Sequence, residues 1–260
     1  MSLIHDLFDL KGQVALVTGG SSGIGRAIAN YLAQAGAAVV HAALPHEEEG
    51  LKAAVTDVES VGSRAAYVTC DVSQLDALPD MAERATACFG PPDILVNAAG
   101  VNFRESWDKV TPESWNKTIT INLTGPFFLA RLLVPSMQEK GWGKIINIAS
   151  LQSLRAFPNS MPYGASKGGV MQLTRAMAEA WSKDQSGITC NAIGPGFFKT
   201  GLTSPLYNDQ KVIDALSRQT IIGRNGELSD LAGVTLFLAS RASDYITGQT
   251  IFLDGGWTAK

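Results

Sequence analysis

The amino-acid sequence predicts an α/β fold: a single domain over residues 1–260, built on a doubly wound sheet of seven parallel strands. Three observations support this. Short apolar runs alternate with longer helical patterns along the whole chain, no repeat or linker divides it, and a glycine-rich turn follows the first run. Such strands are covered on both faces, and parallel strands need right-handed crossovers. Ligands then bind beyond the carboxyl ends of the strands.

The elements follow one another in a regular order. Residues 14–18 form an apolar run typical of a buried strand, and residues 24–35 have small and apolar side chains at helical spacing. Further strands are expected at residues 37–43, 65–69, 94–97, 144–149, 188–193 and 250–253. Helical patterns lie near residues 47–61, 74–89, 112–139, 163–183 and 228–239. Residues 194–218 do not fit this order and are expected to form either a substrate lid or a plain surface loop.

Composition and charge exclude several classes of protein. Hydrophobic residues make up 45% of the chain and the net charge is −3, so neither disorder nor binding to nucleic acid or an anionic membrane is indicated. No run reaches the ~18 unbroken apolar residues of a membrane span. Cys70, Cys88 and Cys190 have no metal-ligand spacing and no disulfide framework. The first twelve residues lack the basic cluster of a secretory signal, so we expect a cytoplasmic protein without a metal.

The turn after the first strand predicts a phosphate site. It reads Thr18-Gly19-Gly20-Ser21-Ser22-Gly23-Ile24-Gly25 and leads into a helix. Gly19, Gly23 and Gly25 let the backbone turn tightly and approach a pyrophosphate, while the helix N-terminus offers N–H groups and a positive dipole end. A glycine turn alone is weak evidence, but its position between the first strand and the first helix favours a dinucleotide.

A second group of residues indicates acid–base chemistry. Ser150 ends the fifth strand, Tyr163 follows 13 residues later, and Lys167 lies one helical turn beyond it. A ketone that accepts hydride becomes an alkoxide, which the phenol of Tyr163 can protonate. The ammonium of Lys167 is expected to lower the pKa of that phenol, and the Ser150 hydroxyl can bind the reacting oxygen.

Taken together, these motifs resemble the short-chain dehydrogenase/reductase family, over essentially the whole chain. The spacing TGxxxGxG, Cys70-Asp71-Val72 after the third strand, and Asn97-Ala98-Ala99-Gly100 after the fourth match the family in order. The resemblance implies a Rossmann-type fold and NAD(P)-dependent hydride transfer. It also implies adenine contacts at Asp71 and Val72, a ribose contact at Lys167, a water relay at Asn122, and carboxamide contacts at Ile193 and Thr200. The expected cofactor residues are Gly19, Ser21, Ser22, Gly23, Ile24, Gly25, Asp71, Val72, Asn97, Gly100, Tyr163, Lys167, Ile193 and Thr200.

The residues just past the second strand usually decide between NAD and NADP. An acid there binds the ribose 2′-hydroxyl of NAD, whereas a basic residue binds the 2′-phosphate of NADP. Ala43 stands at the acidic position and Ser22 where many NADP enzymes have Arg. His41 or His46 could partly serve a phosphate. We therefore expect NAD, with NADP as the alternative.

The substrate is expected to be a sugar acid. Arg104 follows the fourth strand, where a guanidinium can hold a carboxylate, although a surface Arg is the plain alternative. The segments at residues 143–150, 173–177 and 254–257 resemble the family's gluconate and 2-dehydro-3-deoxy-D-gluconate 5-dehydrogenases, which tend to have Arg at this position. Gln152 is a candidate for substrate hydroxyls or for a loop hydrogen bond. Arg224-Asn225-Gly226 departs from the Arg-Trp-Gly often found in these relatives.

Two other functions remain open. A 3-oxoacyl-[acyl-carrier-protein] reductase would need a basic docking patch. Gly141 and Asp184 stand where such reductases often have Arg, although Lys140 and Lys183 are adjacent. A dinucleotide sensor without turnover is disfavoured by the intact Ser150, Tyr163 and Lys167. The resemblance also implies a homotetramer that pairs the helices near 112–139 and 163–183, and Trp257 suggests a docked carboxyl-terminal tail.

Overall fold

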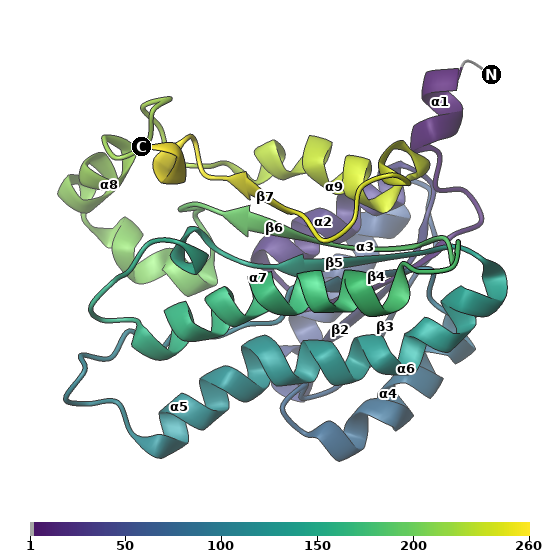
Figure 1. Cartoon of the computed structure of the whole chain (residues 1–260), viewed down its shortest axis with the longest axis horizontal. Coiled ribbons are helices and arrows are strands. Elements are labelled where there is room, and N and C mark those ends of the chain that lie inside the picture. The colour runs from purple at the N-terminus through teal and green to yellow at the C-terminus, as the bar shows by residue number, and fades with distance from the viewer. Residues whose placement is uncertain (1–2) are drawn as a thin grey trace.

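The computed structural model describes residues 3–260 and confirms the α/β fold (Figure 1). Seven strands form one parallel sheet in the order β3-β2-β1-β4-β5-β6-β7. The strands are β1 (Val14–Thr18), β2 (Ala38–Ala43), β3 (Ala65–Thr69), β4 (Ile94–Asn97), β5 (Gly143–Ile148), β6 (Ile188–Pro195) and β7 (Thr250–Leu253). The winding direction reverses between β1 and β4, so the loops that leave these two strands diverge and open a crevice.

Helices cover both faces of the sheet. One layer contains α2 (Gly23–Gln34), α3 (Glu48–Ser60) and α9 (Leu231–Ala239), and the other contains α4 (Leu78–Phe89), α6 (Gly125–Lys140) and α7 (Met161–Trp181). Figure 1 shows α9 and α2 above the sheet and α7, α6 and α4 below it. The helix α5 (Pro112–Ile119) joins α6 through a π-helical turn, Thr120–Thr124. Two shorter helices, α1 (Leu3–Phe8) and α8 (Gln210–Ser217), lie at the ends of the molecule.

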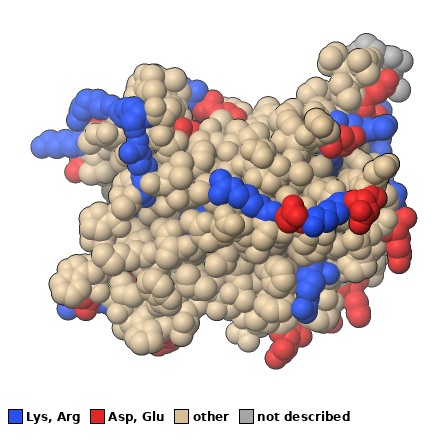
Figure 2. Space-filling model, in the orientation of Figure 1, with Lys and Arg blue, Asp and Glu red and all other residues tan. Residues whose placement is uncertain are grey.

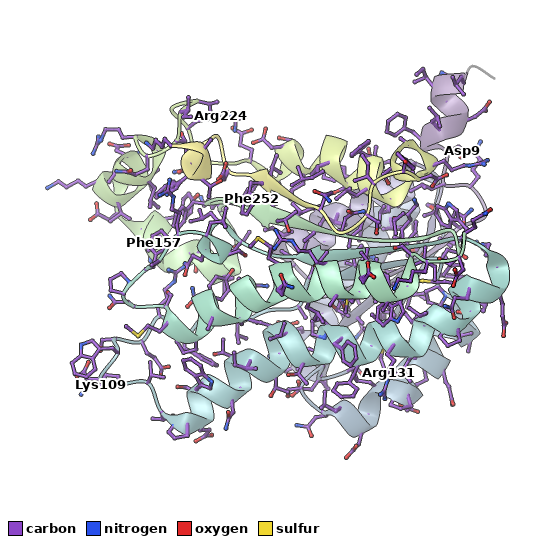
Figure 3. The ribbon with its side chains drawn as sticks, viewed as in Figure 1. Asp9, Lys109, Arg131, Phe157, Arg224 and Phe252 are labelled. Carbon is purple, nitrogen blue, oxygen red and sulfur yellow. The ribbon has the colours of Figure 1, made fainter. Side chains whose placement is uncertain are left out.

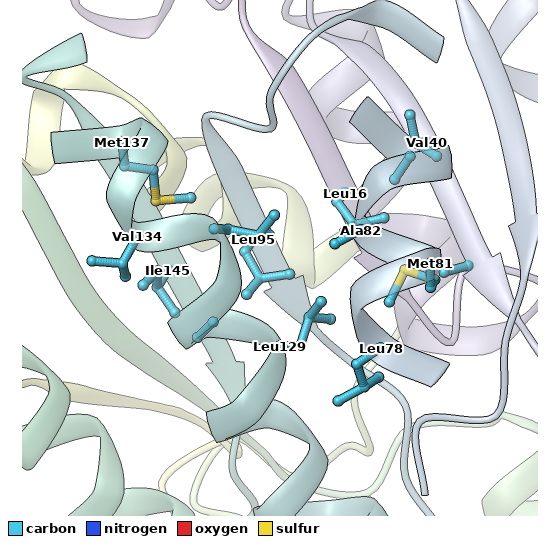
Figure 4. Packing of buried hydrophobic residues seen from close by; sticks show 14 of the residues in the cluster. Leu16, Val40, Leu78, Met81, Ala82, Leu95, Leu129, Val134, Met137 and Ile145 are labelled. Carbon is cyan, nitrogen blue, oxygen red and sulfur yellow. The ribbon is translucent and has the colours of Figure 1, made fainter. Parts of the chain in front are cut away.

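Each face of the sheet has its own hydrophobic core. Leu16, Leu95 and Ile145 point into the core beneath α4 and α6, which Figure 4 shows, while Val17 and Val96 point into the core beneath α2 and α9. This alternation follows from the period of two in a strand, and it explains why the central strands are apolar throughout. Leu95 is fully buried, so its truncation to Ala would cost about 2–5 kcal/mol. The two cores hold the strand ends rigidly in place.

The structure differs from expectation most clearly in the segment after β6. Strand β6 runs on to Pro195, so the segment expected as a lid from residue 194 begins inside the sheet. That segment also contains a 3-10 turn, Gly201–Asn208, and the helix α8, neither of which was expected. The stretch Pro112–Lys140 is apolar and long enough to span a membrane by length and composition. It is half buried, however, and packs on α4 and α7 as a core helix of a globular protein does.

Candidate active site

A cavity of about 380 Å³ lies beyond the carboxyl ends of the strands, where the loops after β1 and β4 diverge. One end is formed by the glycine-rich turn and the loops after β2 and β3, and the other by the loop after β5 and the start of α7. Most of the expected residues line it: Gly19, Ser21, Ser22, Gly23, Ile24, Gly25, Asp71, Val72, Gly100, Ser150, Tyr163, Lys167 and Thr200. The fold thus brings both motifs to one cavity.

The glycine turn is shaped by close backbone contacts. Gly19 has a φ of +66°, and a Cβ there would lie 2.9 Å from the Ala99 backbone nitrogen. A Cβ at Gly25 would collide with the Gly19 carbonyl oxygen. The N-cap residue of α2 is Ser22, and its side chain makes no capping hydrogen bond. The first N–H groups of α2 are therefore not occupied by that side chain. This cradle of glycine backbone at a helix N-terminus fits the pyrophosphate of a dinucleotide.

The loops after β2 and β3 form the adenosine end of the cavity. Asp71 lines it, and its Oδ1 accepts hydrogen bonds from the Ser73 backbone N–H (2.9 Å) and hydroxyl (2.7 Å). Sequence reasoning missed Glu47, which also lines the cavity and accepts a 2.9 Å hydrogen bond from the Ser21 hydroxyl. Glu47 is one of three consecutive glutamates, and nothing in that run indicates which one faces inward.

At the opposite end, the strand β5 and the helix α7 bring three side chains together. Ser150 follows β5 with extended backbone, and its Oγ accepts a 3.1 Å hydrogen bond from the Gln152 N–H. Lys167 Nζ donates to the Ile148 carbonyl oxygen at 2.6 Å and lies 5.7 Å from the centre of the Tyr163 ring. Strand and helix therefore fix a hydroxyl, a phenol and an ammonium at one point of the cavity wall.

The pKa values of these groups are set mainly by burial. Burial raises the pKa of the Tyr163 phenol, and the Ser150 hydroxyl and the positive charge of Arg104 oppose this. Burial thus outweighs the Ser150 hydroxyl and the Arg104 charge, and the lowering of this pKa expected from Lys167 stays a prediction. Burial also lowers the pKa of Lys167 to about 8. A phenol that keeps its proton at neutral pH is suited to donating it.

Asn122 lies in the π-helical turn between α5 and α6. Its Oδ1 accepts from the Val101 N–H at 2.9 Å, and its Nδ2 donates to the Val101 carbonyl and to the Ser166 hydroxyl, each at 3.0 Å. The side chain therefore ties the loop after β4 to α7, beside Lys167, and its polar atoms are used by protein groups. It does not line the cavity. The amide positions its neighbours, and the expected water relay at Asn122 stays a prediction.

The two expected substrate residues flank this end without lining the main cavity. Arg104 has a left-handed backbone with φ 54°, and its Nε is buried with no hydrogen-bond partner among residues 3–260. Its charge acts on Tyr163, which places the guanidinium near the phenol. Gln152 is also buried, and its Oε1 has no hydrogen-bond partner within the described chain. Unpaired buried polar atoms are uncommon and indicate a ligand or a water.

Two expected cofactor residues lie behind the cavity wall. The amide of Asn97 is buried, and its Nδ2 donates to Asn147 Oδ1 at 2.8 Å, which joins β4 to β5. Ile193 is buried inside β6, and its carbonyl accepts from the Ala149 N–H at 2.7 Å. Pro195 and Gly196, two and three residues later, line the cavity instead. The strand β6 runs further than expected, which moves the cavity-lining positions along the chain.

An aromatic cluster joins three segments beside the catalytic end. The ring of Phe197, just after β6, lies 5.2 Å from Trp257 and 6.1 Å from Phe157. Phe157 precedes α7, and Figure 3 places it at the same end of the molecule as Arg224. Trp257 therefore docks the carboxyl-terminal tail, as its size and position predicted. Beyond Phe197, Thr200 lines the cavity, and its N–H donates to Thr203 Oγ1 at 3.0 Å.

Comparison with known proteins identifies the family. A family model described as enoyl-(acyl carrier protein) reductase matches residues 19–258. Gluconate 5-dehydrogenase of Gluconobacter oxydans (strain 621H) is 38% identical over 253 residues, which cover 97% of each chain. The 2-dehydro-3-deoxy-D-gluconate 5-dehydrogenase of Bacillus subtilis (strain 168) is 39% identical over 263 residues, which cover 100% of both.

A solved structure matches equally well. The crystal structure of a gluconate 5-dehydrogenase from Burkholderia cenocepacia J2315 in complex with NADP and tartrate has a TM-score of 0.92 and 38% sequence identity, over 99% of each chain. These similarities extend over the whole sheet, the glycine turn and the cavity described above. The chain therefore belongs to the short-chain dehydrogenase/reductase family and is an oxidoreductase that acts on CH–OH groups with a nicotinamide dinucleotide.

Proposed function

We propose that this enzyme interconverts a secondary alcohol and a ketone on a sugar acid such as gluconate or its 2-dehydro-3-deoxy derivative. The observation that carries this proposal is the Arg104 guanidinium, whose buried Nε no described residue pairs and whose positive charge acts on the pKa of Tyr163. A guanidinium without an acidic partner among the described residues can bind a carboxylate through two parallel hydrogen bonds, one of them to the buried Nε. The relatives that act on gluconate at C5 agree with this substrate class.

In this proposal Tyr163 is the general acid and base. When bound in the cavity, a nicotinamide dinucleotide would supply or accept the hydride. The Tyr163 phenol gives its proton to the ketone oxygen in reduction and takes it from the alcohol in oxidation. The Ser150 hydroxyl donates a hydrogen bond to the same oxygen and steadies its developing charge. Lys167 binds the ribose, and Asn122 positions the loop and helix around it.

Gln152 supplies a second substrate contact. It is held beside Ser150 by its backbone N–H, and a Cβ at Gly164 would lie 3.9 Å from its Oε1. An amide offers both donors and an acceptor, which suits the hydroxyl groups of a sugar chain. With Arg104 on the carboxylate and Ser150 on the reacting oxygen, the substrate would be held at three points. Such a grip fixes which carbon meets the hydride.

NAD is the cofactor that we propose the enzyme prefers. At the adenosine end, the cavity is lined by the acids Glu47 and Asp71. Among the described lining residues, the one basic side chain is Lys167, which lies at the opposite end. A 2′-phosphate would therefore lack a basic partner. The crystal structure of the Burkholderia relative holds NADP, so the two enzymes would differ in this respect.

An acyl-carrier-protein reductase is supported less well. Lys140 Nζ contacts Asp93 at 2.5 Å, and Lys183 Nζ contacts Glu179 at 2.7 Å, so both candidate docking cations are paired with acids. Asp93 directly precedes β4, which places Lys140 at the edge of the sheet opposite the cavity. An acidic carrier protein would find little uncompensated charge there.

For assembly we propose a cytoplasmic homotetramer that pairs the helices of the α5–α7 face. Figure 2 shows that the face toward the viewer is largely uncharged, with one row of alternating basic and acidic side chains. Trp115 and Leu132 are exposed large apolar residues of this helical layer. Such a surface is suited to burial between copies of one chain. Light scattering coupled to size-exclusion chromatography would show four chains, and a monomer would contradict the proposal.

The substrate proposal is tested by initial rates on acidic and neutral substrates. D-gluconate and 2-dehydro-3-deoxy-D-gluconate are compared with their neutral sugar counterparts and a 3-hydroxyacyl thioester. We expect the sugar acids to be oxidised selectively. Arg104→Asn should lower kcat/KM for the acids by ~10²-fold, the cost of a lost charged hydrogen-bond pair, and change neutral substrates by less than ~3-fold.

The variant and its control follow from the backbone. Asn tolerates a left-handed backbone, so Arg104→Asn removes the charge without adding strain at φ 54°. Arg131→Ala, on the exposed face of α6, is the matched control for loss of one Arg (Figure 3). An equal loss on acidic and neutral substrates would refute the carboxylate role. Activity confined to the thioester would establish the acyl reductase instead.

A further inference from the structure

Three glutamates stand in a row where the 3-10 turn Pro45–Glu47 leads into α3, and their partners differ. Glu48 Oε1 accepts a 2.8 Å hydrogen bond from the Tyr67 hydroxyl. Glu49 forms a 2.9 Å ion pair with Lys52, and its side chain is 90% exposed. Glu47 alone of the three lines the cavity, where the Ser21 hydroxyl donates to its Oε2 at 2.9 Å. Glu47 is thus the one whose charge acts inside the cavity.

The backbone holds Glu47 in this position. Its N–H donates to the Leu44 carbonyl at 2.9 Å, and Pro45 fixes the start of the turn. Gly50 lets α3 approach the glycine-rich turn, because a Cβ there would lie 3.1 Å from the Ser21 carbonyl oxygen. The turn after β1 and the start of α3 are therefore packed directly together. The Glu47 carboxylate cannot swing away from the cavity without breaking its hydrogen bond to the Ser21 hydroxyl.

The cations near Glu47 do not neutralise the negative charge of its carboxylate. The nearest cations of the two helices are already paired: Arg26 with Asp57 at 2.7 Å, and Lys52 with Glu48 and Glu49. The N-terminus of α3 would attract an anion through its dipole, but three glutamates stand at that end. Among the described residues, the hydrogen bond to the Glu47 carboxylate is made to Oε2, which leaves Oε1 for a ligand.

We propose that Glu47 is the residue by which this enzyme selects NAD over NADP. Its carboxylate would accept a hydrogen bond from an adenosine ribose hydroxyl and repel a 2′-phosphate. It would do so from the turn beyond β2, whereas the end of that strand carries Ala43 and offers no acid. This inference rests on the proposed NAD preference and assigns that preference to one side chain.

The test is equilibrium binding of NAD⁺ and NADP⁺ to the apoprotein, measured by isothermal titration calorimetry. Wild type is compared with Glu47→Gln, with the conservative Glu47→Asp, and with Glu49→Gln, which removes the same charge two residues away on the exposed side. Thermal unfolding midpoints show that each variant is folded. The initial rate of sugar-acid oxidation is recorded with both cofactors.

Glu47→Gln should lower the ratio Kd(NADP⁺)/Kd(NAD⁺) by at least ~10-fold, mainly by tightening NADP⁺, because a close like-charge pair is removed from a partly buried site. Glu47→Asp should keep a ratio above one, and Glu49→Gln should change it by less than ~2-fold. Equal effects of Glu47→Gln and Glu49→Gln, or an unchanged ratio in Glu47→Gln, would overturn the assignment. A wild type that binds NADP⁺ more tightly would overturn the NAD preference itself, whatever the variants do.

Discussion

The two ends of the cavity carry charged side chains of opposite sign. At the adenosine end, backbone atoms shape the wall and the lining charges are the acids Glu47 and Asp71. At the catalytic end, side chains do the chemistry and the nearby charges are the cations Lys167 and Arg104. If both proposals hold, one cavity would discriminate against a phosphate at one end and for a carboxylate at the other.

The ends also differ in how they tolerate change. The glycine turn depends on the absence of side chains, because a Cβ at Gly19 would meet the backbone of Ala99 and a Cβ at Gly25 would meet the Gly19 carbonyl. The catalytic end depends on the presence of particular groups, so removing one atom can end the reaction while the fold persists. Variants at the two ends should consequently separate binding from turnover.

The largest effect is expected for Tyr163→Phe. Removing one oxygen takes away the proton donor, so kcat should fall by ~10³-fold or more, within the range of general acid–base catalysis. Because Phe keeps the ring and its packing, the Kd for NAD⁺ should change by less than ~3-fold. Steady-state rates and calorimetric binding, measured on the same preparation, would check both. Turnover that survives this substitution would remove Tyr163 from its proposed role.

Gly25→Ala should weaken cofactor binding, whereas Tyr163→Phe should slow turnover. A Cβ at residue 25 collides with the Gly19 carbonyl oxygen, so the turn must move away from its binding geometry. We expect the Kd for NAD⁺ to rise by ~10²-fold, which corresponds to about 3 kcal/mol. Gly233→Ala on α9 is the matched control, because nothing described lies within 4 Å of its added Cβ. If both variants bind NAD⁺ like wild type, the glycine turn is not the cradle.

A separate effect, on stability, concerns His41, which lies under the adenosine end. Its Nδ1 is 3.1 Å from the Gly20 carbonyl, and burial lowers the pKa of the imidazole from 6.5 to about 4. The unfolded chain binds the proton more readily, so this group contributes full stability above about pH 6.5. That contribution, at most about 3 kcal/mol, is lost as the pH falls toward about 4.

Urea unfolding between about pH 7.5 and about pH 4.5 would measure this loss. His41→Asn should flatten the dependence of the unfolding free energy on pH, whereas the exposed His46→Asn should follow wild type. Equal slopes for wild type and His41→Asn would show that other groups cause the acid sensitivity.

The sequence predicted the sheet well because the central strands are apolar on both sides. Residues 14–18, 65–69, 94–97 and 250–253 match their strands at both ends. The helix α8 and the 3-10 turn near the cavity were not predicted, since residues 194–218 carry no sustained periodicity. Their structure depends on contacts such as that between Phe198 and Gly226, which are distant in sequence. Local patterns contain no information about such contacts.

The parts of the site that could be predicted are those whose residues lie close together in the sequence. The glycine turn and the pair Tyr163 and Lys167 are set by spacing within one element. Glu47 was missed because a run of three glutamates looks like a solvated helix start, and only packing against Ser21 selects one of them. Asn97 is bonded inside the sheet, where no spacing rule separates a structural amide from a binding amide.

The docked tail has a consequence for handling this enzyme. Trp257 contacts Phe197 and Phe157, so the carboxyl-terminal tail is packed against the segment that follows β6 and the segment that precedes α7. The amino-terminal helix α1 projects from the opposite corner of the molecule and is largely exposed (Figure 1). An affinity tag, a fluorophore or a surface tether attached before residue 3 would leave the reaction undisturbed. The same attachment after Lys260 would stand three residues from the packed Trp257 and could disturb the aromatic cluster.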